Sequence, residues 1–451
     1  MHQEQFIYQQ FRLSDDRKTA YFDYRVQHDG QAHDLSEAII FPVPLLDSPE
    51  QLRSLRALHL ALGINYYKIF VSPTIRHPYA MTETEAVFWN DIWEHGLGEF
   101  LYVNKLPVAR LAQFAAQNGQ EFAGESVGTT QGVILGIGGG KDSIVAGEML
   151  KSIGLDMAGF VMATGEQLGQ TQSVANAMGV DLHAIQRQMD MRLLELQEQP
   201  GGYKGHFPIS LIFALVGTIL AVAHKSAYVA VANEASSSIP RIVGENGAVN
   251  HQWSKSFGFE QKLQQFIHGS VDMHVTYFSA IRQLTSIGVA KLFAALSQYF
   301  EVFTSDNFVF RIDPAHRPSG RWSLESPKSL SSYLLLAPWL DDTEVQRIFG
   351  IDFLNEPSLV GLFLELTGVE GEPPLDCVGT VDELTLSVNL LAQADRYSDT
   401  VLMKLAVERG IVHDDSWDDL LQVLLELQHD AALPARLHDK ITAYLQEHIA
   451  A

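Results

Sequence analysis

Three glycines followed by Lys-Asp-Ser stand between two apolar runs in the stretch VILGIGGGKDSIVAGEML, residues 133–150. The pattern predicts a buried strand, a glycine-rich turn and then a helix. Free N–H groups at a helix N-terminus bind anions, and glycines at 138–140 let the backbone approach a phosphate closely. Lys141 adds a positive charge, Ser143 adds a hydroxyl, and Asp142 can hold the magnesium ion that accompanies a nucleotide. A tight structural turn is the alternative interpretation.

Two common nucleotide-binding motifs do not fit this loop. The Walker A motif requires a glycine where Leu135 stands and a serine or threonine where Asp142 follows the lysine. The dinucleotide-binding motif requires a third glycine where Lys141 stands. The loop instead resembles the PP-loop of ATP pyrophosphatases, Ser-Gly-Gly-x-Asp-Ser, over residues 138–143, with glycine in place of the first serine. This resemblance implies cleavage of ATP between its α- and β-phosphates and transfer of AMP to a substrate oxygen.

Apolar strands and helices alternate around this loop. Strands are expected at 132–137, 157–164, 181–185 and 228–233, and helices at 142–153, 170–178 and 209–224. Such a pattern predicts the α/β class, with a doubly wound parallel sheet covered on both faces. Ligands bind at the carboxyl ends of the strands in sheets of this type. We therefore expect the site in the loops 138–143, 164–169 and 233–256, with Thr164 also contacting the nucleotide.

The flanking regions have other patterns. Residues 4–41 alternate apolar and polar side chains, which predicts an antiparallel meander. Helices are expected at 49–62 and 82–95, the second with a capping box formed by Thr82 and Glu85. Two features suggest domain boundaries: a Gly- and Ser-containing stretch near 120–130, and the start of a helical pattern beyond 330. We expect an N-terminal α+β domain (1–125), a domain of the PP-loop (HUP-like) type (126–330) and a C-terminal helical domain (331–451).

Composition narrows the class of partner. Acidic residues outnumber basic ones, 54 to 31, giving a net charge of -23. A field of this sign repels polyanions, so we do not expect nucleic acid as a partner. The single cysteine excludes an intrachain disulfide framework and a Cys-cluster zinc site. The first residues do not resemble a signal peptide, and the longest apolar run, 209–223, is shorter than the ~20 residues of a membrane span. We expect a cytoplasmic protein with no membrane partner.

Five further segments resemble one family. They are VANEASSS (231–238), NHQWSKSFGFE (250–260), HLALGINYYKIF (59–70), GLGEFLYVN (96–104) and APWL (337–340). Together they resemble the MurL family of ATP-dependent UDP-N-acetylmuramoyl-L-alanyl-L-glutamate epimerases, over residues 55–385. The second segment is far more specific than the PP-loop. The resemblance implies ATP and Mg²⁺ as cofactors, UDP-MurNAc-L-Ala-L-Glu as substrate, and a place after a MurD-type ligase in peptidoglycan precursor synthesis.

The chemistry of such an epimerisation agrees with a PP-loop. A free carboxylate makes the Cα proton of glutamate very weakly acidic, and pyridoxal phosphate cannot form an aldimine with an acylated nitrogen. A mechanism with two cysteine bases is excluded by the single cysteine. Conversion of the α-carboxylate to an acyl-adenylate removes the negative charge and makes the carbonyl an electron sink. Deprotonation on one face and reprotonation on the other then give the D-centre.

Candidate side chains for these steps stand mostly in the expected ligand-side loops. The acid/base candidates are His251, Lys255, Glu234 and Cys377. A structural histidine, a solvated lysine, a magnesium-binding glutamate and a small buried cysteine are the respective alternatives. The candidate substrate contacts are Arg241, Asn250, Arg311, Arg317 and Arg321, with Trp322 near the uracil. For the arginines, incidental surface salt bridges are the alternative.

Three rival functions remain open from sequence. One is a PP-loop enzyme that modifies tRNA, which the acidic charge and the lone cysteine disfavour. A second is an amide or nitrile synthase that captures the adenylate with ammonia. The third is a non-enzymatic nucleotide-binding regulator. Pyrophosphate release with each candidate substrate distinguishes them.

Overall fold

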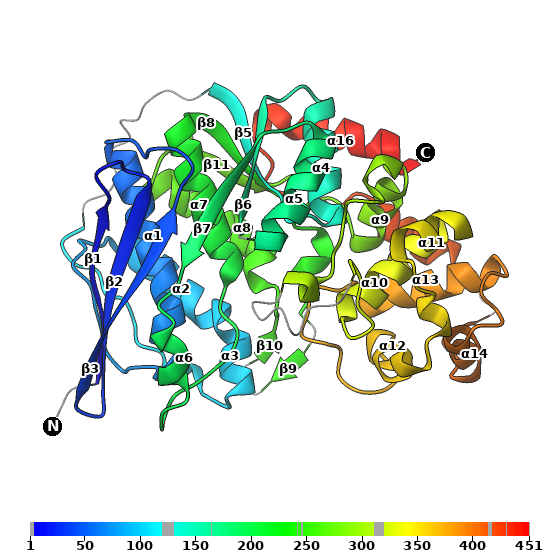
Figure 1. Ribbon diagram of the computed structural model, residues 1–451, viewed down its shortest axis with the longest axis horizontal. Coiled ribbons are helices and arrows are strands. Elements are labelled where there is room, and N and C mark those ends of the chain that lie inside the picture. The colour runs from blue at the N-terminus through cyan, green and yellow to red at the C-terminus, as the bar shows by residue number, and fades with distance from the viewer. Residues whose placement is uncertain are drawn as a thin grey trace.

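A mixed nine-stranded sheet runs through the molecule in this computed structural model (Figure 1), which describes residues 4–119, 130–163, 165–240, 242–244, 247–310, 320–413, 417–429 and 431–450. Its strand order is β11-β8-β5-β6-β7-β3-β2-β1-β4. The strands are β1 (Gln5–Leu13), β2 (Thr19–His28), β3 (Gln31–Ile40), β4 (Ile75–Arg76), β5 (Thr130–Gly136), β6 (Met157–Met162), β7 (Leu182–Gln188), β8 (Ser226–Val231) and β11 (Thr276–Ser279). A separate hairpin contains β9 (Ile242–Gly244) and β10 (Gly247–Val249).

The parallel half of the sheet confirms the predicted α/β class. Strand β5 lies at its centre, with β6 and β7 on one side and β8 and β11 on the other, and each neighbouring pair is parallel. The chain adds β6 and β7 on one side of β5 and then crosses back to add β8 and β11 on the other side. The strand order therefore reverses between β5 and β8. In open sheets of this kind, such a reversal leaves a crevice at the carboxyl ends of the two strands. The loops after β5 and β8 are therefore brought together.

The predicted N-terminal meander is confirmed, but it is not a separate sheet. Strands β1, β2 and β3 pair antiparallel, and β3 then pairs antiparallel with β7 through Ile39 opposite Arg187. The sequence did not predict this junction, because alternation identifies a strand but not its distant partner. The domain boundary predicted near residue 125 lies outside the described residues.

Helices cover both faces of the sheet, and alternate strand residues face alternate helix layers. On one face, Ile134 and Val229 pack with α1 (Pro49–Tyr67) and α7 (Ile209–His224). On the other, Val133 and Ala230 pack with α4 (Lys141–Ser152) and α9 (Ser286–Ala294). The other helices before the C-terminal region are α2 (Glu83–Gly96), α3 (Gly98–Val103), α5 (Gly165–Met178), α6 (Arg192–Gln197) and α8 (Phe257–Ser270).

Two helices, α2 and α7, follow the local signals in the sequence. Thr82 and Glu85 form the predicted capping box of α2. Helix α7 has the predicted bounds, and most of its residues are buried. This is the expected result for an apolar helix between a sheet and a second helix layer. Among the described residues, no helix combines the length and apolar character needed to cross a membrane.

The C-terminal region is helical, as predicted. It contains α10 (Pro327–Leu336), α11 (Asp342–Phe349), α12 (Val360–Leu366), α13 (Val381–Gln393), α14 (Val401–Glu408), α15 (Asp418–Leu425) and α16 (Ala435–Ala450). Helix α16 returns to pack on α4 and α9.

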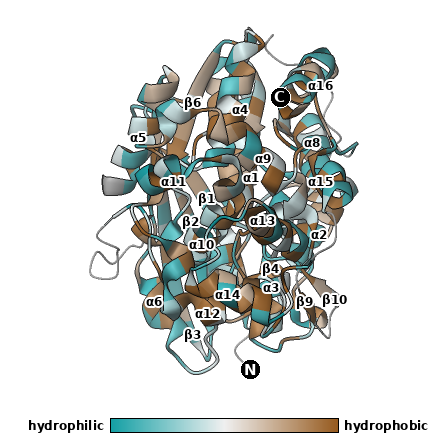
Figure 2. Ribbon diagram, turned by 90° about the vertical axis from the view of Figure 1, so that its right-hand side faces the viewer, coloured by the Kyte–Doolittle hydropathy of each residue, from teal (hydrophilic) through white to brown (hydrophobic). Residues whose placement is uncertain are grey.

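In Figure 2, hydrophobic residues dominate β6 at the sheet, whereas hydrophilic residues are frequent on the peripheral helices α5 and α16.

Candidate active site

The glycine loop joins β5 to α4 as predicted, and its backbone donors are available to a ligand. Gly140 is the N-cap residue of α4, and no described side chain caps this helix. Gly139 has a φ of +88°, a conformation that side-chain-bearing residues rarely adopt. The amide of Thr304 donates to the carbonyl of Gly139 at 3.1 Å, which ties the loop to the segment around residue 304. The first N–H groups of α4 are thus left for an anion.

Side chains around the loop suit a nucleotide phosphate with its metal. The Lys141 ammonium lies 2.5 Å from the Asp142 carboxylate. Burial favours a lower pKa for Lys141, but Asp142, Glu234 and Glu383 outweigh it and raise the pKa. The buried Oγ of Ser305 has no hydrogen-bond partner among the described residues, and a Cβ at Gly140 would lie 3.2 Å from it. An uncapped helix, an orphan hydroxyl and a close glycine fit a phosphate group.

A cavity of about 590 Å³ extends from this loop. Its walls come from the loop after β5, from the start of α7 and from the segment 251–255. Lys328 of α10 and Cys377 also line it. Such a volume lies within the range typical of small-molecule sites. The cavity connects the glycine loop with a second cluster of ionisable groups.

The second cluster is centred on Cys377. The Nζ of Lys255 donates to the Sγ of Cys377 at 3.2 Å. Burial favours a higher pKa for the thiol, but the charge of Lys255 and a hydrogen bond from His251 lower the pKa to about 6. Burial favours a lower pKa for Lys255, but the neighbouring Cys377 outweighs burial and raises the pKa. The arrangement therefore holds a thiolate between two cations at neutral pH.

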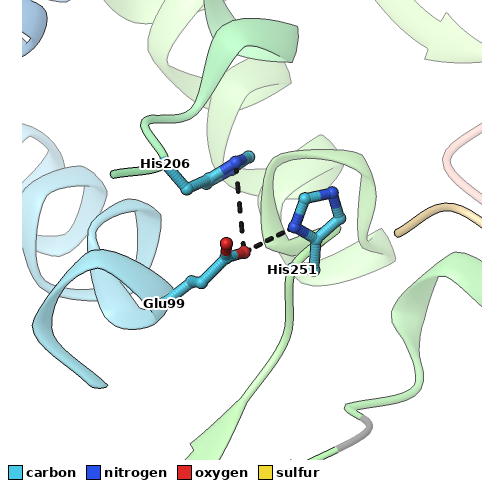
Figure 3. A group of neighbouring side chains, drawn as sticks. All are labelled: Glu99, His206 and His251. Atoms are coloured by element: carbon cyan, nitrogen blue, oxygen red, sulfur yellow. Dashed lines mark hydrogen bonds and ion pairs between the residues drawn. The ribbon is translucent and has the colours of Figure 1, made fainter. Parts of the chain in front are cut away.

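Two histidines, His206 and His251, lie close to the carboxylate of Glu99 (Figure 3). The Nδ1 of His251 lies 2.5 Å from Oε2 of Glu99, and the Nδ1 of His206 lies 4.0 Å from the same oxygen. Burial opposes the charged form of His251, yet Cys377 and Glu99 raise its pKa to about 9. Burial dominates at His206 and lowers its pKa to about 4. Neighbouring imidazoles thus differ in charge at neutral pH, and only His251 is a cation.

The predicted residues Glu234 and Asn250 lie in the supporting loops. The Oε1 of Glu234 accepts a long hydrogen bond, 3.4 Å, from Ser286, and its charge acts on both Lys141 and Lys255. Asn250 closes a turn, accepting from the amide of Gln252 at 2.8 Å and donating to the carbonyl of Ser237 at 3.0 Å. Neither residue is among those that line the cavity.

Arg321 is partly buried and Trp322 is buried, and neither lines the cavity. The Arg321 guanidinium donates to the carbonyls of Phe300, Phe303 and Ile348 at 2.8, 2.9 and 3.2 Å. The Trp322 ring is buried and donates to Ile348 at 2.9 Å. These contacts favour a structural role for both, in place of the predicted contacts with a diphosphate and uracil. The predicted ligands Thr164, Arg241, Arg311 and Arg317 lie outside the described residues.

Sequence reasoning missed four residues of the site: Glu99, His206, Ser305 and Lys328. Glu99 falls within the segment GLGEFLYVN, which carried the family resemblance but no chemical motif. It stands 152 residues from His251. No spacing rule connects groups so far apart, so only the fold identifies them as partners.

Comparison of the sequence with known proteins identifies its family. A family model of the MurL N-terminal domain matches residues 1–280, and one of the MurL C-terminal domain matches residues 302–419. The chain belongs to the MurL family. Its relatives include UDP-N-acetyl-alpha-D-muramoyl-L-alanyl-L-glutamate epimerases of Micromonospora sp., 31% identical over 404 residues (88% of each chain), and of Salinispora tropica, 29% identical over 404 residues (88% of this chain, 86% of the relative). The corresponding epimerase of Xanthomonas oryzae is 29% identical over 392 residues (87% and 86%). MurL relatives named as epimerases place the chain among the isomerases.

Proposed function

We propose that this chain epimerises the terminal L-glutamate of UDP-MurNAc-L-Ala-L-Glu to D-glutamate, with ATP cleaved to AMP and pyrophosphate through an acyl-adenylate of the glutamate α-carboxyl. The observation that supports it best is a single cavity lined by both the glycine loop and the Cys377 cluster. The identity of the UDP-sugar dipeptide rests on the names of the relatives.

The residues of the loop suit the adenylation half of the reaction. ATP supplies the AMP group that neutralises the α-carboxylate and makes its carbonyl an electron sink. The N-terminal N–H groups of α4 and the Ser305 hydroxyl would bind phosphate oxygens, and Asp142 would hold Mg²⁺. Lys141 lies beside Asp142 and would offset phosphate charge.

The second cluster suits proton transfer at the α-carbon. Cys377, Lys255 and His251 all line the cavity, and each can carry a proton at Sγ, Nζ or the imidazole. Glu99 orients the His251 ring and stabilises its charged form. Of the predicted acid/base candidates, the geometry thus favours these three over Glu234.

The proposed substrate also defines a place in metabolism. An L-glutamate must first be joined to a UDP-MurNAc-L-alanine carboxyl, which is the reaction of a MurD-type ligase. The product then carries the D-centre of peptidoglycan precursors. These steps act on soluble nucleotide precursors, so we propose that this chain works in the cytoplasm.

Isotope incorporation tests this function. The chain is incubated with ATP, Mg²⁺ and UDP-MurNAc-L-Ala-L-Glu in heavy water, and the expected products are AMP, pyrophosphate and a dipeptide deuterated at the glutamate α-carbon. Asp142→Ala is expected to abolish AMP formation. Asp181→Ala, which changes a carboxylate just before β7, at the amino ends of the parallel strands and so at the opposite end from the glycine loop, is the matched control. Full turnover by Asp142→Ala would contradict the role of the loop, and nucleotide binding without pyrophosphate release would favour a regulator.

A further inference from the structure

Cys377 belongs to a cluster of four interacting side chains, the others being Lys255, His251 and Glu99. Its sulfur contacts Lys255 at 3.2 Å, and an imidazole nitrogen of His251 lies within 4.8 Å of the sulfur. The Nδ1 of His251 is bound to Glu99 at 2.5 Å (Figure 3), which leaves Nε2 for the cysteine. A thiol, a base and a carboxylate that orients the base form the arrangement of activated nucleophiles.

The sulfur is also placed near the predicted adenylation site. Cys377, Asp142 and Ser143 line the same cavity. Lys255 lines this cavity too, and both Cys377 and Asp142 act to raise its pKa. An acyl group activated at the glycine loop would thus face the thiol across one continuous space.

We propose that the glutamyl group passes from the adenylate to Cys377, and that the α-carbon is inverted while the glutamate is held as a thioester. This inference rests on the proposed function. The sulfur of the thiolate attacks the acyl carbon, the bond between that carbon and the phosphate oxygen breaks, and AMP leaves with the electron pair. After inversion, water attacks the thioester carbonyl, its proton passes to the neighbouring base, and the thiolate leaves. No oxidant or reductant takes part.

The neighbours of Cys377 explain why a thioester would be productive. Sulfur donates less electron density to a carbonyl than oxygen does, so the thioester stabilises a carbanion at Cα. Acylation also removes one of the negative charges that raise the pKa of His251 and Lys255, while Glu99 still acts on His251 and Glu234 and Asp142 still act on Lys255. One of the two then releases its proton to water and takes the proton from the α-carbon, and the other, still protonated, donates its proton to the opposite face. The transfer step would therefore prepare this pair for the next step.

A substrate analogue separates acyl transfer from deprotonation. The α-methylglutamyl analogue of the substrate has no α-proton, so it can be adenylated and transferred but not epimerised. With wild-type protein, ATP and Mg²⁺, we expect one AMP per chain in a rapid first turnover. Intact-protein mass spectrometry of acid-quenched samples should show the acyl group on Cys377, removable by hydroxylamine. The natural substrate, labelled with ¹⁴C in its glutamate, should show the same adduct at early times.

Cys377→Ala keeps the proposal falsifiable where the adduct is short-lived. Pyrophosphate release from the natural substrate by this variant shows that it is folded and adenylates. With the analogue, we expect its AMP release to fall at least 100-fold below that of the wild type. AMP release within tenfold of the wild type would overturn the thioester, because a cysteine that acts only as a base is not needed for this reaction.

Failure of this inference and failure of the proposed function give different results. Deuterium uptake by the wild type, combined with unimpaired AMP release from the analogue by Cys377→Ala, would exclude the thioester alone. Absence of ATP-dependent pyrophosphate release and of deuterium uptake in the wild type would reject the proposed function. Cys377→Ala should also carry no acyl adduct in the mass spectrum, which is the control that no other residue is acylated, because the chain has one cysteine.

Discussion

The Nζ of Lys255 lies 3.2 Å from the Sγ of Cys377, although 122 residues separate them in the chain. Lys255 follows the β9–β10 hairpin, and Cys377 precedes α13. The first residue falls in the segment that matches the MurL N-terminal domain, and the second falls in the segment that matches the C-terminal domain. The cluster is therefore complete only when both regions are folded against each other.

The first prediction concerns the titration of Cys377. Its pKa is lowered to about 6, with Lys255 as the main cause opposing burial. Lys255→Met removes that charge, while burial and the hydrogen bond from His251 remain, so the thiol pKa should rise from about 6 toward its ordinary value. The pH dependence of alkylation by iodoacetamide measures it directly, because Cys377 is the only cysteine.

The control for this titration is Lys262→Met, which removes an exposed lysine paired with Asp91 on the surface. Its alkylation profile should match that of the wild type. A midpoint that stays near 6 in Lys255→Met would show that Lys255 is not the main group that stabilises the thiolate.

A second prediction concerns His251, whose pKa is raised to about 9. Glu99→Gln removes one stabilising anion, so the His251 pKa should fall, as measured by NMR titration of the imidazole. Because the folded pKa lies above the unfolded one, this stabilisation is complete below about pH 6.5 and is lost as the pH rises through 9. Glu99→Gln should therefore lower the free energy of unfolding more at pH 6 than at pH 9.5. Glu94→Gln, at an exposed position of α2, is the control.

The third prediction separates the structural role of the glycine loop from its role in binding. A Cβ at Gly138 would meet no atom within 4 Å, whereas Gly139 has a φ of +88°. Gly138→Ala should leave the unfolding midpoint unchanged but reduce pyrophosphate release at least tenfold, because the alanine methyl group would enter the space that the ATP phosphates are proposed to occupy. Gly139→Ala should also destabilise the fold by about 1 kcal/mol.

Gly361→Ala in α12 has equally open surroundings and serves as the control for substitution itself. If Gly138→Ala releases pyrophosphate at the wild-type rate, the phosphates do not bind against this residue.

The fourth prediction concerns a buried ion pair under the active site. The side chains of Arg282 and Glu260 are each 1% exposed, and Arg282 also donates to the carbonyls of Glu234 and Lys255. Arg282→Met leaves a buried carboxylate unpaired and should cost about 3–5 kcal/mol in denaturant unfolding. Arg347→Met breaks an exposed pair with Glu301 and should cost about 0–1 kcal/mol. Equal costs would show that the buried pair contributes little.

Much of the fold was predictable because its signals are local. The apolar run before Gly138 and the helix that begins at Lys141 were both recognised, since strand and helix periodicity are properties of neighbouring residues. The same holds for the capping box of Thr82 and Glu85. The pairing of β3 with β7 was missed, because it depends on the register of strands far apart in the chain.

The sequence alone determined the glycine-rich loop between strand and helix, because backbone donors and glycine conformations depend on a few consecutive residues. It also determined family membership through short, specific segments. Only the tertiary structure decided that Cys377 is held by Lys255 and His251, that Glu99 orients His251, and that Arg321 supports the interior. The physical reason is that charge, burial and hydrogen bonding act through space, so the chemistry of these groups depends on neighbours that the fold supplies.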